Sequence, residues 1–279
     1  MPLSSPYKDL HIYYIEGIPE PGSIDFDKDF FGNWQEDGYS FLFFSTPADD
    51  EVNRLVFRQP QLTLIDVYTM SYEEWQGGKP GPITIGGFLI VPPWCSSIDK
   101  APEGMEKIIL DPGVVFGTGM HPTTRDCLEA VKRLCYKEKI ETAIDIGTGT
   151  GLLAIAAVSM GCRHVVAVDV NFLAAKTAKR NAFLNGMKRE ISVIQGQAED
   201  FIDKPADLVI ANIHYDVMKN LVKKKYFQTK KYFILSGLLK SQAREIDGML
   251  NDLSLTMLNR LEHDGIWYTF CGRTGCERT

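Results

Sequence analysis

The regular alternation of short apolar runs with helical segments after residue 141 constrains the fold of this 279-residue chain more than any other feature. The apolar runs are TAIDI, HVVAVDV, ISVIQG, ADLVIAN and YFILSG, and helix-length segments separate them. This pattern predicts a parallel sheet with helices on both faces. The final stretch LSLTMLNRLEHDGIWYTFCGR has two extended runs around His263-Asp264-Gly265, which predicts a hairpin. We therefore expect an α/β fold whose mostly parallel seven-stranded sheet ends in a C-terminal antiparallel hairpin.

Residues 1–92 differ from the rest of the chain in amino acid composition. They are rich in aromatic residues, Gly and Pro, with strand-like pieces such as HIYYIEG and YSFLFFST and a helix expected near residues 48–58. We predict a small N-terminal α+β domain over residues 1–92, a linker over 93–106 and the main domain over 107–279.

The stretch DIGTGTG, residues 145–151, follows the first apolar run of the main domain and predicts a ligand-binding turn. Glycines there let the backbone turn tightly and bring amide groups close to a ligand. The spacing differs from the dinucleotide fingerprint G-x-G-x-x-G, because Leu152 stands where that fingerprint has its third glycine. Asp145 would repel a pyrophosphate and attract an ammonium group, so we expect a ligand that carries an amine.

Asp169 ends the next apolar run, 22 residues after Gly147, where a carboxylate can accept hydrogen bonds from both hydroxyls of a ribose. The alternative is a structural carboxylate near a helix N-terminus, beside Asn171. The pattern D-x-G-x-G-x-G followed by this acid resembles the class I methyltransferases, whose fold is Rossmann-like. The resemblance implies S-adenosylmethionine as cofactor and S-adenosylhomocysteine as product. It also implies that the glycine turn faces the methionine part, Asp169 the ribose, and a residue of the segment 197–199 the adenine. The expected cofactor-binding residues in these segments are Asp145, Gly147, Thr148, Gly149, Gly151, Asp169, Val170, Gln197, Ala198 and Glu199.

A sharper resemblance lies upstream of the turn. LDPGVVFGTGMHPTT, residues 110–124, is similar to the signature of the methyltransferases that modify the ribosomal large-subunit protein 11, and VPPW, ADLVIANI and FILSGLL extend the likeness over about residues 88–272. The resemblance implies that this loop folds over the cofactor, while His121 and Pro122 lead into a helix. The alternative is a plain turn and helix start. The residues expected to line the cofactor site here are Phe116, Thr118, Gly119, Met120 and Thr124.

Asn212 follows the fourth apolar run and is the residue we expect to hold the acceptor. Its side chain and the Ile213 carbonyl can accept the N–H bonds of an amine and aim its lone pair, and we also expect Asn212 to contact the cofactor. The segment Asn212-Ile213-His214-Tyr215 resembles the Asn-Pro-Pro-Tyr tetrad of amino-methylating relatives. It departs from the protein 11 methyltransferases, in which Ile-Leu-Ala usually follows the Asn. His214 could take a proton and Tyr215 could wall the acceptor, or both could begin a helix capped through Asp216.

The amino acid composition indicates which kinds of molecule the protein is expected to bind. The 36 acidic and 30 basic residues give a net charge of -6, which disfavours nucleic acid as the main partner. The lysine-rich stretch 221–232 is interpreted as a solvated helix end, with an RNA-binding patch as the alternative. The cysteines lack metal-ligand spacing, and so do His11, His164 and His263, so we expect no metal. The chain has no membrane-length apolar stretch, so we expect a cytoplasmic protein. We also expect the protein to act as a monomer.

The family resemblance implies an enzyme that methylates amines, lysine side chains or an N-terminus, of a ribosomal protein, with large-subunit protein 11 as the expected substrate. In that family the small N-terminal domain holds the protein substrate, but residues 1–92 echo it only loosely. Two alternatives stay open. One is a methyltransferase for another protein, a nucleobase or a small molecule, and the other is a non-catalytic protein that keeps the cofactor site as an interaction module.

Overall fold

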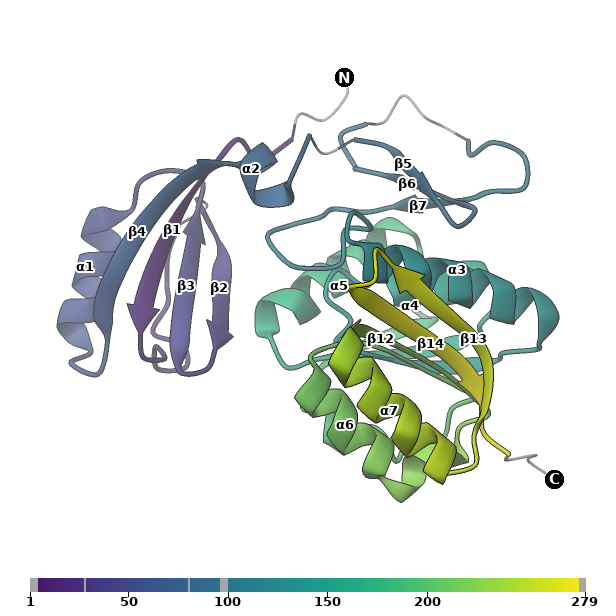
Figure 1. Cartoon of the computed structure of the whole chain (residues 1–279). Coiled ribbons are helices and arrows are strands. Elements are labelled where there is room, and N and C mark those ends of the chain that lie inside the picture. The colour runs from purple at the N-terminus through teal and green to yellow at the C-terminus, as the bar shows by residue number, and fades with distance from the viewer. Residues whose placement is uncertain (1–4, 28, 80, 96–99, 276–279) are drawn as a thin grey trace. The chain divides into compact units, whose positions relative to one another are not determined.

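A seven-stranded sheet forms the centre of the larger part of the chain in the computed structural model, which describes residues 5–27, 29–79, 81–95 and 100–275 (Figure 1). The first five strands in spatial order are mutually parallel, and the sixth is antiparallel to both of its neighbours. The predicted seven-stranded sheet with a C-terminal hairpin is therefore confirmed. The strands in spatial order are β10 (Ile191–Gln195), β9 (His164–Asp169), β8 (Thr142–Ile146), β11 (Leu208–Asn212), β12 (Tyr232–Leu239), β14 (Trp267–Arg273) and β13 (Thr256–His263).

Helices cover both faces of this sheet, as the sequence predicts. Alternate residues of each strand point to opposite faces, so Ala143 packs with the first group of helices and Ile144 with the second. The first group is α3 (Pro122–Lys137), α4 (Leu152–Ser159) and α5 (Phe172–Leu184). The second group is α6 (Tyr215–Lys223) and α7 (Lys240–Asp252), and two short 3-10 turns complete the connections, η1 (Ala198–Asp200) and η2 (Lys225–Thr229). None of the helices in the described residues is long and apolar enough to cross a membrane.

A second, three-stranded sheet belongs to the same unit. Its strands are β5 (Ile83–Ile85), β6 (Phe88–Val91) and β7 (Glu106–Ile109), with β6 parallel to β7. Phe88 and Ile90 are buried in the same core cluster as α3. The described residues divide into compact units after Gly81, so β5 and β6, which the sequence boundary at residue 92 gives to the small domain, pack with the larger unit. Residues 96–99 of the expected linker lie outside the described residues.

The smaller unit is the predicted α+β domain. Four antiparallel strands form a sheet in the order β2-β3-β1-β4, and α1 packs on one face through Val52 and Leu55. A short helix follows β4, and it begins with a capping box between Ser71 and Glu74. The elements are β1 (Asp9–Glu16), β2 (Phe30–Glu36), β3 (Tyr39–Phe44), α1 (Asp49–Arg58), β4 (Thr63–Ser71) and α2 (Tyr72–Gln76).

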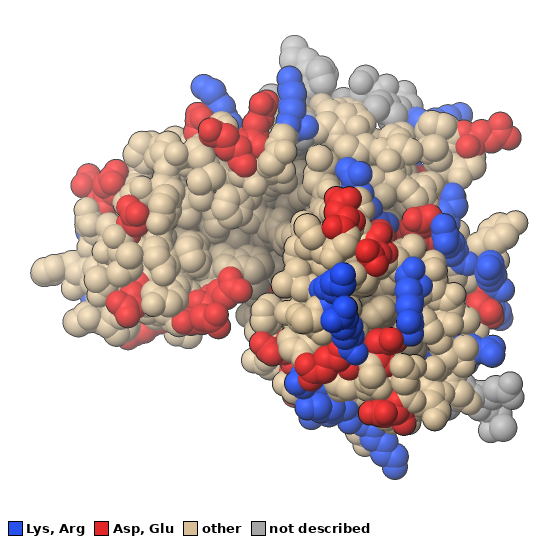
Figure 2. All heavy atoms as spheres, in the orientation of Figure 1, with Lys and Arg blue, Asp and Glu red and all other residues tan. Residues whose placement is uncertain are grey.

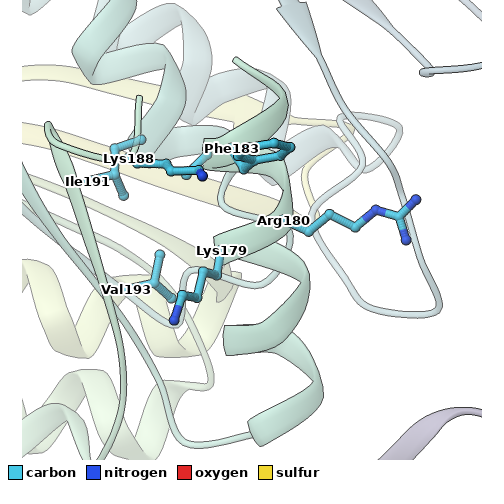
Figure 3. A pocket seen from close by; sticks show the side chains of 7 residues that line it. Lys179, Arg180, Phe183, Lys188, Ile191 and Val193 are labelled. Carbon is cyan, nitrogen blue, oxygen red and sulfur yellow. The ribbon is translucent and has the colours of Figure 1, made fainter. Parts of the chain in front are cut away.

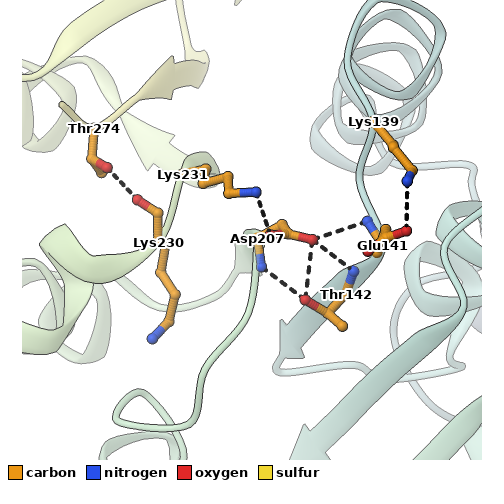
Figure 4. Close-up of polar contacts among 7 residues, drawn as sticks. All are labelled: Lys139, Glu141, Thr142, Asp207, Lys230, Lys231 and Thr274. Atoms are coloured by element: carbon orange, nitrogen blue, oxygen red, sulfur yellow. Dashed lines mark hydrogen bonds and ion pairs between the residues drawn. The ribbon is translucent and has the colours of Figure 1, made fainter. Parts of the chain in front are cut away.

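The amino ends of β8, β11 and β12 meet at Asp207, which lies just before β11 (Figure 4). The glycine turn follows the opposite, carboxyl end of β8. The Oδ2 atom of Asp207 accepts hydrogen bonds from the backbone N–H groups of Glu141 and Thr142 at 3.0 and 3.1 Å, and its Oδ1 atom lies 3.0 Å from Lys231 Nζ. Burial alone would raise the pKa of Asp207, but the Lys231 ammonium and these backbone donors outweigh it and lower the pKa below its ordinary value. One carboxylate thus ties the starts of β8, β11 and β12.

The lysine-rich stretch ends α6 with the exposed side chains of Lys223, Lys224 and Lys225, as expected for a solvated helix end, but Lys230 is fully buried. Its ammonium donates hydrogen bonds to the carbonyls of Ile202 and Lys204 at 2.6 and 2.8 Å. A buried cation is tolerated only where acceptors satisfy its donors. Lys230 therefore serves the packing of the connection before β11, and a count of lysines along the sequence does not reveal that role.

Asp207→Asn should lower the free energy of unfolding at pH 7 by about 1 to 3 kcal/mol, because it weakens the charged hydrogen bonds that join the start of β11 to the starts of β8 and β12. A carboxylate whose pKa is lowered on folding stabilises the protein above the pKa of its unfolded form, and that stability is lost as the pH falls through the folded-state pKa. Urea titrations at pH 7 and pH 3 would measure both effects. The matched control is Asp203→Asn, which removes the same charge from an exposed position. Equal losses in the two variants would contradict the assignment.

Candidate functional site

The glycine turn joins β8 to α4 through backbone conformations that only glycine adopts readily. Gly147, Gly149 and Gly151 have φ angles of +69°, +55° and +82°. The N–H groups of Gly147 and Thr148 donate to Val168 O at 2.8 and 3.0 Å, so the turn leans on the end of β9. A Cβ atom at Gly147 would lie 2.2 Å from a side-chain atom of Ile213. The turn therefore packs between the carboxyl ends of β9 and β11.

Asp145 lies beneath this turn and is 1% exposed. Its Oδ2 atom accepts hydrogen bonds from Thr148 Oγ1 at 2.6 Å and from the Ala154 N–H group at 3.2 Å, whereas its buried Oδ1 atom has no hydrogen-bond partner among the described residues. Burial raises the pKa of Asp145 to about 7, against the lowering effect of those two hydrogen bonds, and the nearby charge of Asp169 raises it further. A buried carboxylate oxygen that lacks a donor fits a ligand that brings an ammonium group.

Asp169 ends β9 on the other side of the turn and is 7% exposed. Its Oδ2 atom accepts a hydrogen bond from the Gly149 N–H group at 3.0 Å. The alternative reading of Asp169 as a helix-capping carboxylate loses its support, because Asn171 accepts the Leu173 N–H bond at 2.9 Å and caps α5. Two buried carboxylates therefore flank one glycine turn.

The segment after β10 lies next to the end of β9. Gln195 Nε2 donates to Val170 O at 3.2 Å, and the Gly196 N–H group donates to Asp169 O at 2.9 Å. Gln197 precedes η1, which contains Ala198 and Glu199. The backbone thus brings the segment expected near adenine alongside the expected ribose carboxylate.

The loop before α3 is attached directly to the glycine turn. Phe116 O accepts a hydrogen bond from the Thr150 N–H group at 3.0 Å, and Gly117 O accepts one from Thr150 Oγ1 at 2.5 Å. A Cβ atom at Gly149 would lie 2.4 Å from Phe116 O, so a side chain there would push the loop away. Phe116 and Met120 keep 51% and 44% of their surface exposed, which leaves two large apolar side chains free to contact a ligand. Thr118 is half-buried, and Gly119 packs against the isoleucines of β5 and β6.

Asn181 of α5 holds this loop and the turn together, and sequence analysis did not identify it. Its Nδ2 atom donates to Asp111 O at 2.9 Å and to Thr150 O at 2.8 Å, and its Oδ1 atom accepts from the Asp111 N–H group at 2.8 Å. Asn181 is fully buried. The available signal was an amide on the apolar side of a helix, which needs buried partners.

The start of α3 brings the loop signature to the acceptor side. His121 is the N-cap residue, and its Nδ1 atom accepts a hydrogen bond from the Thr123 N–H group at 3.4 Å. Burial lowers the pKa of His121, and the charge of His263 lowers it further, so both effects favour the neutral ring that this cap requires. Thr124 is buried, and its Oγ1 atom accepts a hydrogen bond from Asn212 Nδ2 at 3.4 Å. The Asn212 amide is thus oriented by a residue of the loop signature.

Gly237 of β12 leaves the acceptor groups uncovered. With a φ angle of +87°, it lies where a Cβ atom would come within 2.9 Å of Ile213 O and 3.2 Å of Asn212 Oδ1. Any side chain at this position would crowd the two oxygens expected to bind an amine. Gly237 escaped sequence analysis because only the pairing of β12 beside β11 reveals its neighbours.

The other two residues of the expected tetrad, His214 and Tyr215, contact residues of α6 and α7. His214 is the N-cap residue of α6, its side chain is 76% exposed, and its Nδ1 atom lies 3.5 Å from Asp216 Oδ2. The Tyr215 hydroxyl donates to Glu245 of α7. The structure therefore brings Asn212 and Ile213 to the glycine turn, while His214 and Tyr215 make contacts along α6 and α7.

A surface hollow of about 510 Å³ lies elsewhere, against α5 and β10 (Figure 3). The Lys188 ammonium sits 3.9 Å above the Phe183 ring at this hollow, and Arg180 extends away from it toward Asp111, 3.0 Å from Oδ2. None of the residues expected to bind the cofactor lines it. The lining residues are Lys179, Arg180, Ala182, Phe183, Lys188, Ile191 and Val193.

The order of the strands and the site at their carboxyl ends define the class of the protein. A mostly parallel seven-stranded sheet with a C-terminal hairpin, a glycine turn after β8 and a carboxylate after β9 is the arrangement of the class I methyltransferases. The family described as "Ribosomal protein L11 methyltransferase (PrmA)" matches residues 53–274. The chain belongs to this family, and the expected family resemblance is confirmed.

Individual known proteins similar to this chain carry the name of the same family. A protein of Caldicellulosiruptor bescii named "Ribosomal protein L11 methyltransferase" is 38% identical over 177 residues, 62% of this chain and 56% of that protein. One of the same name from Desulfitobacterium hafniense is 34% identical over 224 residues, 78% of this chain and 70% of that protein. The solved structure of a ribosomal protein L11 methylase from Lactobacillus delbrueckii matches with a TM-score of 0.62 and 28% identity, over 70% of this chain and all of the other. The chain thus spans little more than half the length of the first of these relatives.

Asp145→Asn should change how stability depends on pH. Because burial raises the pKa of Asp145 from 3.8 to about 7, the folded ligand-free protein binds more protons than the unfolded chain between these values. Its stability should therefore fall as the pH rises from about 4 to about 7, and the variant should lack this fall and be more stable at pH 8 by roughly 1 to 4 kcal/mol. Urea titrations between pH 5 and pH 8 measure this, with exposed Asp252→Asn as the control. Parallel curves for wild type and Asp145→Asn would refute the interpretation.

Proposed function

We propose that this protein is an S-adenosylmethionine-dependent methyltransferase that modifies amines of a ribosomal protein, with large-subunit protein L11 as the substrate. The family match over residues 53–274 supports the reaction, and the names of the relatives support the substrate. The observation that carries the proposal is the unpartnered Oδ1 atom of Asp145 beneath the glycine turn. An amino acid ammonium would supply the missing donor and favour the ionised carboxylate, whereas a phosphate would disfavour that ionised form.

The residues around the turn fit this cofactor. Asp145 would pair with the ammonium of its methionine part, and the backbone of the glycine turn would lie against that part, because Gly147, Gly149 and Gly151 carry no side chains. Asp169 would accept hydrogen bonds from the ribose hydroxyls beside Val170. Gln197, Ala198 and Glu199 would border the adenine, since their segment joins the end of β9 through Gly196.

The loop that ends in α3 would cover the cofactor. Phe116 and Met120 are large apolar side chains on this loop, and Thr150 fixes the loop backbone to the turn. Thr118 and Gly119 complete the lining, while Thr124 contacts Asn212. Asn181 holds the start of the loop, so its role would be to position the cover.

The acceptor amine would bind at Asn212 and Ile213. The cofactor supplies a methyl group already activated by a sulfonium sulfur, so the protein has to present a neutral amine with its lone pair in line. Asn212 Oδ1 and Ile213 O accept the amine N–H bonds, and Gly237 keeps both oxygens accessible. Removal from water lowers the pKa of a lysine amine from about 10.4 and favours the neutral form. Catalysis would rest on positioning.

His214 and Tyr215 would act outside this positioning step. Their contacts with Asp216 and Glu245 support a role in shaping the surface beside the acceptor. The proposed setting is the cytoplasm, with the protein acting as a monomer on a ribosomal protein. The smaller unit, which holds β1 to β4, α1 and α2, would recognise that substrate.

The proposed function is tested by titrating the purified protein with S-adenosylmethionine and then following radiolabelled methyl transfer to total ribosomal proteins. Saturable binding and one labelled band at the size of protein L11 are expected. Binding without any labelled ribosomal protein would refute the substrate, and absence of binding would refute the cofactor.

Asn212→Ala should lower the rate of methyl transfer by about 100-fold, because the amine loses one of its two orienting acceptors. Cofactor affinity should remain close to that of the wild type. Single-turnover assays with saturating cofactor, together with calorimetry, separate the two effects. Asn220→Ala, which removes an exposed amide from α6, is the control. A large loss of cofactor affinity would show that Asn212 serves the cofactor instead.

A further inference from the structure

The sheet of the smaller unit carries a line of aromatic side chains on the face opposite α1. Strand register defines this face, because Trp34 of β2 lies opposite Phe41 of β3, which lies opposite Tyr14 of β1. Tyr39 is two residues from Phe41 on the same strand, and Tyr68 of β4 lies opposite Ile12. We name these five residues the aromatic face: Tyr14, Trp34, Tyr39, Phe41 and Tyr68.

The aromatic face is ordered and accessible. The rings of Tyr14 and Phe41 stack with centroids 4.8 Å apart and an interplanar angle of 7°, and Tyr39 lies 5.2 Å from Tyr14. Tyr68 is 43% exposed, and the other members are half-buried. The neighbouring Phe43 is buried against Trp75 of α2, with centroids 5.2 Å apart. The accessible part therefore includes Tyr39 at the β2–β3 hairpin and Tyr68 on β4, whereas Phe43 between β1 and β2 is covered.

Three exposed carboxylates share this face. Glu16 and Glu36 each lie opposite Tyr39, and Asp66 lies opposite Tyr14. None of the described strand residues on this face is Lys or Arg. Residues 1–81 hold 14 acidic and 5 basic side chains, whereas the rest of the chain holds 22 acidic and 25 basic ones. In Figure 2, acidic side chains outnumber basic ones on the visible side of this unit.

We infer that the aromatic face and its three carboxylates dock a lysine- and arginine-rich segment of the protein substrate. Cationic side chains bind over aromatic rings and gain charge-assisted hydrogen bonds from adjacent carboxylates. The same carboxylates would repel the phosphates of a nucleic acid. This inference rests on the proposed function for the identity of the substrate, but binding at the aromatic face can be measured without catalysis.

The test compares two variants of the full chain that remove the same charge. In the first, amides replace the three carboxylates of the aromatic face, as E16Q/E36Q/D66N. In the control, amides replace three acids in the first turn of α1, on the opposite side of the sheet, as D49N/D50N/E51Q. The probes are a 15-residue Lys/Arg peptide, an oligouridylate of equal length and purified ribosomal protein L11, each titrated by calorimetry after thermal unfolding confirms folding.

The first variant should bind the peptide and protein L11 at least tenfold more weakly than the wild type, whereas the control should change either affinity less than threefold. In methylation assays the first variant should raise the KM for protein L11 and leave kcat and cofactor affinity unchanged. Equal weakening in both variants, or tighter binding of oligouridylate than of peptide by the wild type, would overturn the inference. If the wild type methylates nothing and peptide binding still depends on the aromatic face, the proposed function fails and the docking surface stands.

Discussion

The carboxylate of Asp145 is the constraint around which the site is arranged. Charge is costly to bury, and only one of its oxygens is satisfied by the protein, through Thr148 and Ala154. The glycine turn must bend tightly to enclose it, which explains three consecutive alternate glycines with positive φ angles. The Oδ1 atom of Asp145 therefore has no hydrogen-bond donor among the described residues, and the ionised carboxylate destabilises the folded protein in the absence of a ligand. A cationic ligand would supply the missing donor and stabilise the ionised form.

Topology brings the other groups to this carboxylate. The strand order reverses between β8 and β11, so the carboxyl ends of both lie beside the turn. Asn181 then fastens the loop before α3 to Thr150, and the loop delivers Thr124 to Asn212. The loop and its hydrogen bonds therefore connect the glycine turn to Asn212. Asp207 holds the opposite, amino ends of the same strands together.

Local patterns predicted the central sheet, its hairpin, α1, and the placing of Asp145, Asp169 and Asn212 at strand ends. These features depend on period, turn chemistry and strand order, which a sequence carries directly. Asn181 and Gly237 were missed because their partners lie far away along the chain. The burial of Lys230 and the packing of β6 beside β7 were missed for the same reason. Each depends on neighbours that are distant along the sequence.

The most direct measurement is the number of protons released when S-adenosylhomocysteine, which carries the same ammonium group, binds at pH 6. Calorimetry in two buffers with different ionisation enthalpies gives this number. In the ligand-free protein Asp145 is mostly protonated at that pH, because burial raises its pKa to about 7. Pairing with the ammonium should ionise it, so the wild type should release close to one proton and Asp145→Asn none. Binding without proton release by the wild type would contradict the role assigned to Asp145.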